Sequence, residues 1–371
     1  MPGLTLPVKY NHWVRDKISN DLQHLVLMDM SYYSIQRDMK GILIDRTKAV
    51  DFYDRRLDFP NATSVPKMAN PLSTEECIED SVFQLCELAD KHSGGVLSNK
   101  KIYVLWSGGI DSSTALLGIW RYARHLFNQS RVIVLHTESS TNESPFIYKW
   151  MLENNIQAEQ VSSVIEFLKG QSQAPDSITN DNNNIYVTGE LGDQIMGNFY
   201  NMGAFPLLND EVNFLSKDVF SFLNPIEDKE RKDSWYEFSR LIYDNRKTDI
   251  ETVFDLLSWA NFTCKYEHPK YRLWLSTGRK MPTYNFFDTD EFQNWAMNNN
   301  WREKCNGNWW TQYKMPWKKF IHDVTGNDYA LVMRKQASLV QDHGDQMIDR
   351  KFRYIDENFE VRSALDESKI F

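Results

Sequence analysis

The chain has 371 residues, 42% hydrophobic and 13% aromatic, with 42 lysines and arginines against 51 aspartates and glutamates. This length favours two or three structural units, and the apolar content excludes wholesale disorder. The net charge of -9 argues against a general nucleic-acid binder, because phosphate affinity comes from clustered lysine and arginine. The sequence has no run of 18 apolar residues, so we predict no membrane span.

Cysteine usage and the first residues favour a cytoplasmic location. The four cysteines, Cys77, Cys86, Cys264 and Cys305, form no C-x-x-C pair and no cysteine–histidine metal spacing, so we expect reduced thiols. The first residues also lack the basic-then-apolar order of a secretory signal.

Residues 1–70 are predicted to form a small α+β segment of unknown role. Apolar spacing over residues 12–30 predicts an amphipathic helix, and residues 40–45 are typical of a short strand. Residues 58–71 are typical of a loop because prolines interrupt them, and we place a domain boundary there.

Residues 71–205 alternate helical patterns with buried apolar runs, which predicts a parallel α/β sheet covered on both faces. A serine and a threonine followed by acids at residues 73–79 predict the start of a helix that ends near His92. Further helices are predicted over residues 113–127 and 144–153. Continuous apolar runs predict buried strands at residues 102–106, 132–135 and 185–188.

Residues 206–371 are predicted to be mainly helical and to shape the substrate side of the molecule. Apolar and aromatic residues recur at helical spacing over residues 231–244 and 251–262. No convincing buried strand follows them in the sequence.

The most informative stretch is S-G-G-I-D-S-S at residues 107–113, between a predicted strand and a predicted helix. Gly108 and Gly109 allow a sharp turn and a close approach to an anion. Amide groups at a helix start, together with serine hydroxyls, can bind phosphate oxygens at the carboxyl end of a strand. Asp111 lies inside this loop, where its carboxylate would repel bound phosphates. A cation such as Mg²⁺ between the carboxylate and the phosphates would remove this repulsion.

Two common phosphate-binding motifs are excluded for this stretch, and one structural alternative remains. It is not a Walker A loop, since no G-K-[ST] follows at the required spacing, and it contains no G-x-G-x-x-G. The alternative is a glycine–serine turn between a strand and a helix, with Asp111 as a capping residue.

In full, the loop resembles that of the PP-loop ATP pyrophosphatase superfamily, whose pattern is S-G-G-x-D-[ST]. A second stretch, T-G-E-L-G-D-Q-I-M-G-N at residues 188–198, resembles the T-G-E-G-x-D-E-x-F-G-G stretch of asparagine synthetases. Fainter similarity follows at residues 281–288 and 332–339, so that the resemblance covers roughly residues 71–345. It implies a parallel-sheet PP-loop core of the HUP, or adenine nucleotide alpha hydrolase-like, kind.

The resemblance also implies an activity. Family members adenylate a carboxylate with Mg-ATP, release pyrophosphate, and transfer the acyl group to an amine as AMP leaves. Asparagine synthetases obtain ammonia from an N-terminal cysteine-dependent glutaminase domain, and the first 70 residues here contain no cysteine. The expected amine source is therefore free ammonia, a separate glutaminase subunit, or an amine on a second substrate, including an intramolecular one.

Positions that match the family's motifs give a set of expected site residues. By role, these are pyrophosphate-binding Ser107, Gly108, Gly109, Ser112 and Ser113, nucleotide-binding His136 and Gly189, metal-binding Asp111 and Asp193, and catalytic Glu190 and Lys335. Arg334, Lys318 and Lys319 could reach the same phosphates as Lys335. His136 has an alternative role as a core histidine. Leu191 and Gln194 depart from the pattern, standing where the family often has a small residue and an acid.

Two alternative functions remain open at this stage. One is a PP-loop enzyme that modifies a nucleobase or tRNA, although the acidic balance argues against tRNA and thiolation usually needs paired cysteines. The other is a nucleotide-binding protein with a decayed active site, for which Gln194 is the main argument. The sequence also leaves open whether residues 1–70 cover the site, form a homodimer surface or replace the glutaminase.

Overall fold

A computed structural model describes residues 43, 45–48, 64–91, 101–170, 184–197, 229–277, 281–305, 313–333, 353–355 and 361–363. The helix expected over residues 12–30, and most of the strand expected over 40–45, lie outside these residues. Within the described ranges, no helix is both long and apolar enough to cross a membrane.

The chain divides into two compact units. One contains Met1–Val65, Phe199–His268 and Ile348–Phe371, and the other contains Pro66–Asn198 and Pro269–Met347. The first 65 residues are thus grouped with residues 199–268, whereas the sequence suggested separate segments with boundaries near residues 70 and 205. Residues 269–347, however, group with the α/β unit and not with the helical segment before them, because they supply a strand to its sheet.

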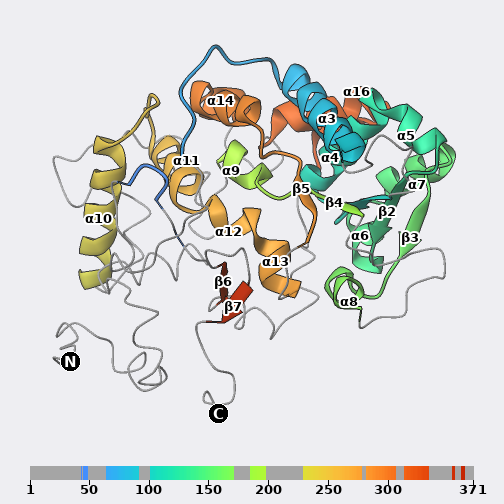
Figure 1. The fold of residues 1–371 in the computed structure, drawn as a ribbon. Coiled ribbons are helices and arrows are strands. Elements are labelled where there is room, and N and C mark those ends of the chain that lie inside the picture. Colours follow the sequence, from blue (N-terminus) through green and yellow to red (C-terminus); the bar gives the residue numbers. More distant parts are fainter. Residues whose placement is uncertain are drawn as a thin grey trace. The chain divides into compact units, whose positions relative to one another are not determined.

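The α/β unit is built on a five-stranded parallel sheet with the order β3-β2-β1-β4-β5 (Figure 1). The strands are β1 (Ile102–Leu105), β2 (Val132–His136), β3 (Ala158–Gln160), β4 (Ile185–Thr188) and β5 (Thr283–Asn285). The three strands predicted from apolar runs are confirmed. Strands β3 and β5 were not predicted, because each has three residues and none of their side chains is fully buried.

On one face of this sheet α4 contacts the strands β1 and β4, and it belongs to a connected layer of helices (Figure 1). The layer comprises α3 (Thr74–Lys91), α4 (Ile110–Tyr122), α14 (Asp290–Asn298) and α16 (Met315–Thr325). The predicted start of α3 is confirmed by a reciprocal cap: the Ser73 amide donates to Glu76 Oε2 at 2.8 Å, and the Glu76 amide donates to Ser73 Oγ at 3.2 Å.

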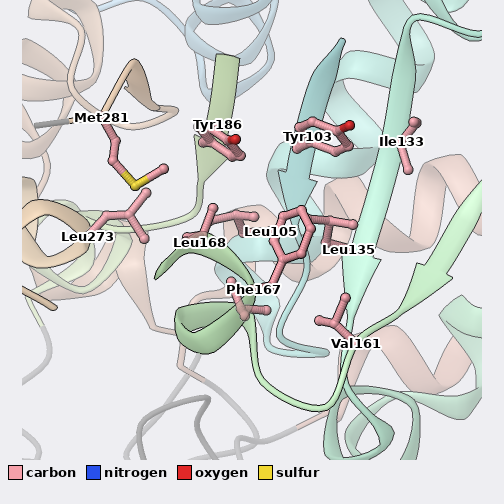
Figure 2. Packing of buried hydrophobic residues seen from close by; sticks show 11 residues of the cluster. Tyr103, Leu105, Ile133, Leu135, Val161, Phe167, Leu168, Tyr186, Leu273 and Met281 are labelled. Atoms are coloured by element: carbon pink, nitrogen blue, oxygen red, sulfur yellow. The ribbon is translucent and has the colours of Figure 1, made fainter. Parts of the chain in front are cut away.

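The opposite face is covered by α8 (Val164–Lys169) and α13 (Arg272–Thr277), which contact each other. Figure 2 shows Tyr103 of β1 beside Tyr186 of β4, with ring centroids 5.6 Å apart, and Phe167 of α8 below them. Because alternate strand residues point to opposite faces, one set fills this cluster and the other faces α4. Burial on both faces explains the continuous apolar runs in β1, β2 and β4.

Shorter elements complete the α/β unit. They are α5 (Arg124–Asn128), α6 (Glu138–Glu143), α7 (Pro145–Glu153), α9 (Gly192–Met196), α15 (Trp301–Lys304) and the 3-10 helix η5 (Asp328–Leu331). The helix predicted over residues 113–127 is thus two helices, α4 and α5, and the one predicted from Ser144 is α7 with Pro145 in its first turn.

The other unit contains α10 (Lys229–Asp244) packed on α11 (Val253–Cys264), and a two-stranded antiparallel pair, β6 (Arg353–Ile355) and β7 (Val361–Ser363). Both predicted helices are confirmed, and α11 is buried along its whole length. α12 (Glu267–Lys270) spans the division between the units in the sequence.

Candidate functional site

Two loops meet where the strand order of the sheet reverses. Strand β1 lies between β2 and β4, and the crevice beyond the carboxyl ends of such strands is where open α/β sheets bind ligands. The first loop (residues 107–113) follows β1, and the second loop (residues 189–193) follows β4. The two stretches that the sequence singled out are therefore neighbours in space.

Two glycines of the second loop make its close approach to the first loop possible. A Cβ added to Gly189 would lie 2.6 Å from the Ser112 amide nitrogen and 2.8 Å from the Asp111 carbonyl carbon. A Cβ added to Gly192 would lie 2.6 Å from Asp111 Cγ. Contacts this short are not tolerated, so only glycine at these positions allows the present spacing of the two loops.

Hydrogen bonds among its own serines hold the first loop in shape. The Ser107 amide donates to Ser112 Oγ at 3.1 Å, and the Ser107 and Ser112 hydroxyls are 2.9 Å apart. Ser113 is fully buried, and its hydroxyl accepts a bond of 2.9 Å from the Trp106 indole. Of the expected phosphate-binding hydroxyls, Ser113 therefore lies inside the protein.

The backbone of the first loop suits an anion site. Gly108 has a φ of +77°, and a Cβ there would meet the Ser140 carbonyl oxygen and Glu143 Cβ in α6, so glycine is required. Helix α4 begins after Gly109 without a side-chain cap. The first amide groups of such a helix point outward, and together with the helix dipole they favour an anion.

Asp111, Asp193 and Lys314 form the charged centre of the site. Asp111 lies in the first turn of α4, and Asp193 in the first turn of α9. The Lys314 ammonium lies 2.5 Å from both Asp111 carboxylate oxygens and 2.6 Å from Asp193 Oδ1. The lysine side chain is 6% exposed. One buried ammonium thus joins two acids from different strand ends.

Lys314 is not among the site residues expected from the sequence, whose lysines are at positions 318, 319 and 335. It directly precedes α16 with a φ of +58°, and α16 has no side-chain cap. Nothing in the sequence distinguishes this lysine from those that follow it in the same segment. Its role is set by contacts with residues 121 and 203 positions away.

The two carboxylates of this cluster stabilise the charged form of Lys314. Burial disfavours the charged form of Lys314, but the Asp111 and Asp193 carboxylates outweigh it and raise the pKa of the lysine. Removing one partner of a buried ion pair is costly because the other charge is left uncompensated.

The donor set of the cluster fits a magnesium ion only in part. Among the described residues, no group of three or more histidine, cysteine or acidic side chains could hold a metal by itself. Two carboxylates are nevertheless the oxygen ligands that Mg²⁺ uses when phosphate oxygens and water fill its other positions. Asp111 and Asp193 could therefore hold the ion together with a polyphosphate.

Glu190 is oriented by an ion pair that the sequence did not reveal. Its Oε1 lies 3.1 Å from Nη1 of Arg272 in α13, and its amide donates to Thr188 Oγ1 at 3.3 Å. Thr188 in turn donates to Asn285 Oδ1 of β5 at 2.8 Å. Both members of the ion pair are about one-third exposed, so the pair is accessible from solvent and contributes little to stability.

His136 lies in the interior of the unit. It is 1% exposed, and its ring centroid is 5.2 Å from that of Tyr148 and 6.3 Å from that of Trp106. Burial lowers the pKa of its imidazole. This environment matches the alternative role of a core histidine.

The two departures from the family pattern are both buried. Leu191 is 1% exposed and has a φ of +72°, a conformation that favours glycine, so the small residue of the family would be less strained there. Gln194 is 4% exposed and lies within α9.

Lys335 and Arg334, the expected phosphate-binding cations, lie outside the described residues.

Lys318 is fully buried and lies one turn after Lys314. Burial is the main cause that lowers the pKa of Lys318 to about 8, and repulsion from the Lys314 charge lowers it further. Between that value and the usual one near 10.4, the unfolded chain binds a proton that the folded protein does not, so this lysine makes stability rise with pH. Below pH 8 the folded protein bears the full cost of the buried charge.

We therefore expect Lys318→Met to raise the free energy of unfolding at pH 7 by about 3 kcal/mol. The difference between variant and wild type should shrink steadily from pH 8 to pH 10, as measured by urea denaturation. Because variant and wild type are compared at the same pH, the titration of groups shared by both proteins cancels. A difference in stability that does not vary with pH would contradict the lowered pKa of Lys318.

The fold and the site together define a parallel α/β protein with two loops meeting at the switch point of its sheet. No protein-family model matches the sequence. A search of curated proteins finds no significant match either.

Proposed function

We propose that this protein is an ATP-dependent ligase that forms AMP. A substrate carboxylate oxygen attacks the α-phosphate of ATP, and the bond from that phosphorus to the bridging oxygen breaks as pyrophosphate leaves. Ammonia or an amine then attacks the acyl carbon, loses a proton, and displaces AMP to give an amide. The proposed cofactor is Mg²⁺. The ammonia would come either from solution or from a separate glutaminase subunit.

The observation that carries the proposal is the convergence of Asp111, Asp193 and Lys314 beside the uncapped start of α4. Pyrophosphate gains negative charge as it leaves, and fixed amide groups and a buried ammonium are suited to stabilise it. Mg²⁺ bound by the two carboxylates would neutralise further charge on the phosphate oxygens.

Glu190 is the proposed base of the second half-reaction. Its carboxylate, about one-third exposed, follows the carboxyl end of β4, at the same edge of the sheet as the loop that carries Asp111. It would accept the proton released when the amine attacks the acyl carbon. Arg272 would orient this carboxylate.

The expected products separate this proposal from its alternatives. Incubation with Mg-ATP, an ammonium salt and pooled carboxylic and amino acids should yield AMP and pyrophosphate, with stimulation by at least one pool. Production of ADP and phosphate would contradict the proposal, because a different bond is then broken. ATP binding without AMP formation over any pool would favour a binding protein, and tight, salt-sensitive binding of bulk tRNA would favour an RNA-modifying enzyme.

A further inference from the structure

The Lys314 ammonium occupies the space between the two proposed metal ligands. Its nitrogen lies within 2.6 Å of three carboxylate oxygens, two from Asp111 and one from Asp193. A magnesium ion holds its oxygen ligands at roughly 2.0–2.1 Å and requires a near-octahedral arrangement. The ion and the ammonium cannot satisfy the same oxygens at once, so binding of one requires movement of the other.

Lys314 cannot leave the acids without another anion. Its side chain is 6% exposed, and a buried charge without a partner is strongly disfavoured. The faces of Tyr313 and Trp317, with centroids 5.5 Å and 5.3 Å from the ammonium, offer only partial compensation. A polyphosphate bound at the start of α4 would supply the missing anion.

We propose that Lys314 is an exchangeable counter-ion, which competes with Mg²⁺ for Asp111 and Asp193 and makes metal binding depend on nucleotide. This inference rests on the proposed function, since it takes ATP as the arriving anion. Without nucleotide, the ammonium keeps both carboxylates engaged. When nucleotide and metal arrive together, the ammonium exchanges the carboxylates for phosphate oxygens, and the metal takes its place on the acids.

The direct test measures Mn²⁺ binding, by electron paramagnetic resonance of the free ion, to the full chain without nucleotide. Wild type should show weak binding, and with ATP added, protein and nucleotide together should bind more Mn²⁺ than the same concentration of ATP binds alone. Lys314→Gln removes the competing charge, so it should bind one Mn²⁺ at least about tenfold more tightly than wild type. The matched control is Lys149→Gln, which removes an exposed lysine 3.6 Å from Glu153 and should leave Mn²⁺ affinity unchanged.

A second comparison covers the case in which Lys314→Gln fails to fold because two acids repel each other. In an Asp193→Asn background only one carboxylate remains, and Asp111 is partly exposed. The double variant Lys314→Gln, Asp193→Asn should bind Mn²⁺ more tightly than Asp193→Asn alone. Equal affinities in this pair, or in the wild-type pair, would overturn the inference.

Failure of the inference and failure of the proposed function give different results. If AMP forms but loss of Lys314 leaves Mn²⁺ affinity unchanged, the ligase proposal stands and the counter-ion role is wrong. If Mn²⁺ binding tightens in Lys314→Gln but ATP yields ADP, the counter-ion role stands and the ligase proposal is wrong.

Discussion

Asp111→Asn is expected to lower the rate of AMP and pyrophosphate formation at least about a thousandfold. The substitution keeps the shape of the side chain, which matters because Gly192 packs directly on it. It removes the negative charge that engages Lys314 through both carboxylate oxygens and that would hold the metal. The measurement is the rate of AMP and pyrophosphate release with saturating Mg-ATP and a stimulating substrate pool.

The fold should survive this change, because Lys314 remains paired with Asp193. Thermal unfolding followed by circular dichroism should therefore stay cooperative. Asp290→Asn is a suitable control, since Asp290 is also an acid in the first turn of a helix but is exposed. Undiminished pyrophosphate release by Asp111→Asn would refute the site assignment.

Gly189→Ala is expected to separate the two loops. The added Cβ would lie 2.6 Å from the Ser112 amide nitrogen and 2.8 Å from Ser112 Cα, and these backbone atoms cannot rotate away as a side-chain end could. We expect a loss of stability of about 1–3 kcal/mol, together with at least about tenfold weaker ATP binding. Urea denaturation and an equilibrium ATP titration measure the two effects.

Gly326→Ala provides the matched control for this substitution. A Cβ at Gly326 has no heavy atom within 4 Å, so its only cost is the left-handed backbone with a φ of +67°. It should lose about 1 kcal/mol of stability and keep its affinity for ATP. An unchanged ATP affinity in Gly189→Ala would show that the contact between the loops does not shape the binding site.

A comparison of the strands shows what kind of signal the sequence carries. Strands β1, β2 and β4 are buried on both faces, so every position in them is apolar and the pattern is visible without a structure. Strand β5 has three half-buried residues, and pairing with β4 is what makes it a strand. Its membership in the sheet also assigns residues 269–347 to the α/β unit, which no local pattern could do.

The sequence by itself determined the parallel α/β core, the start of α3 and the two loops that end β1 and β4, because each depends on local patterns of a few residues. Only the tertiary structure decided that Lys314 joins Asp111 and Asp193, that Arg272 pairs with Glu190 and that His136 is buried. Lys314 and Asp111 are 203 positions apart, and Arg272 and Glu190 are 82 apart. Such partners are chosen by packing and charge across the folded chain, and a lysine or arginine that finds one has no local feature to separate it from a solvated neighbour.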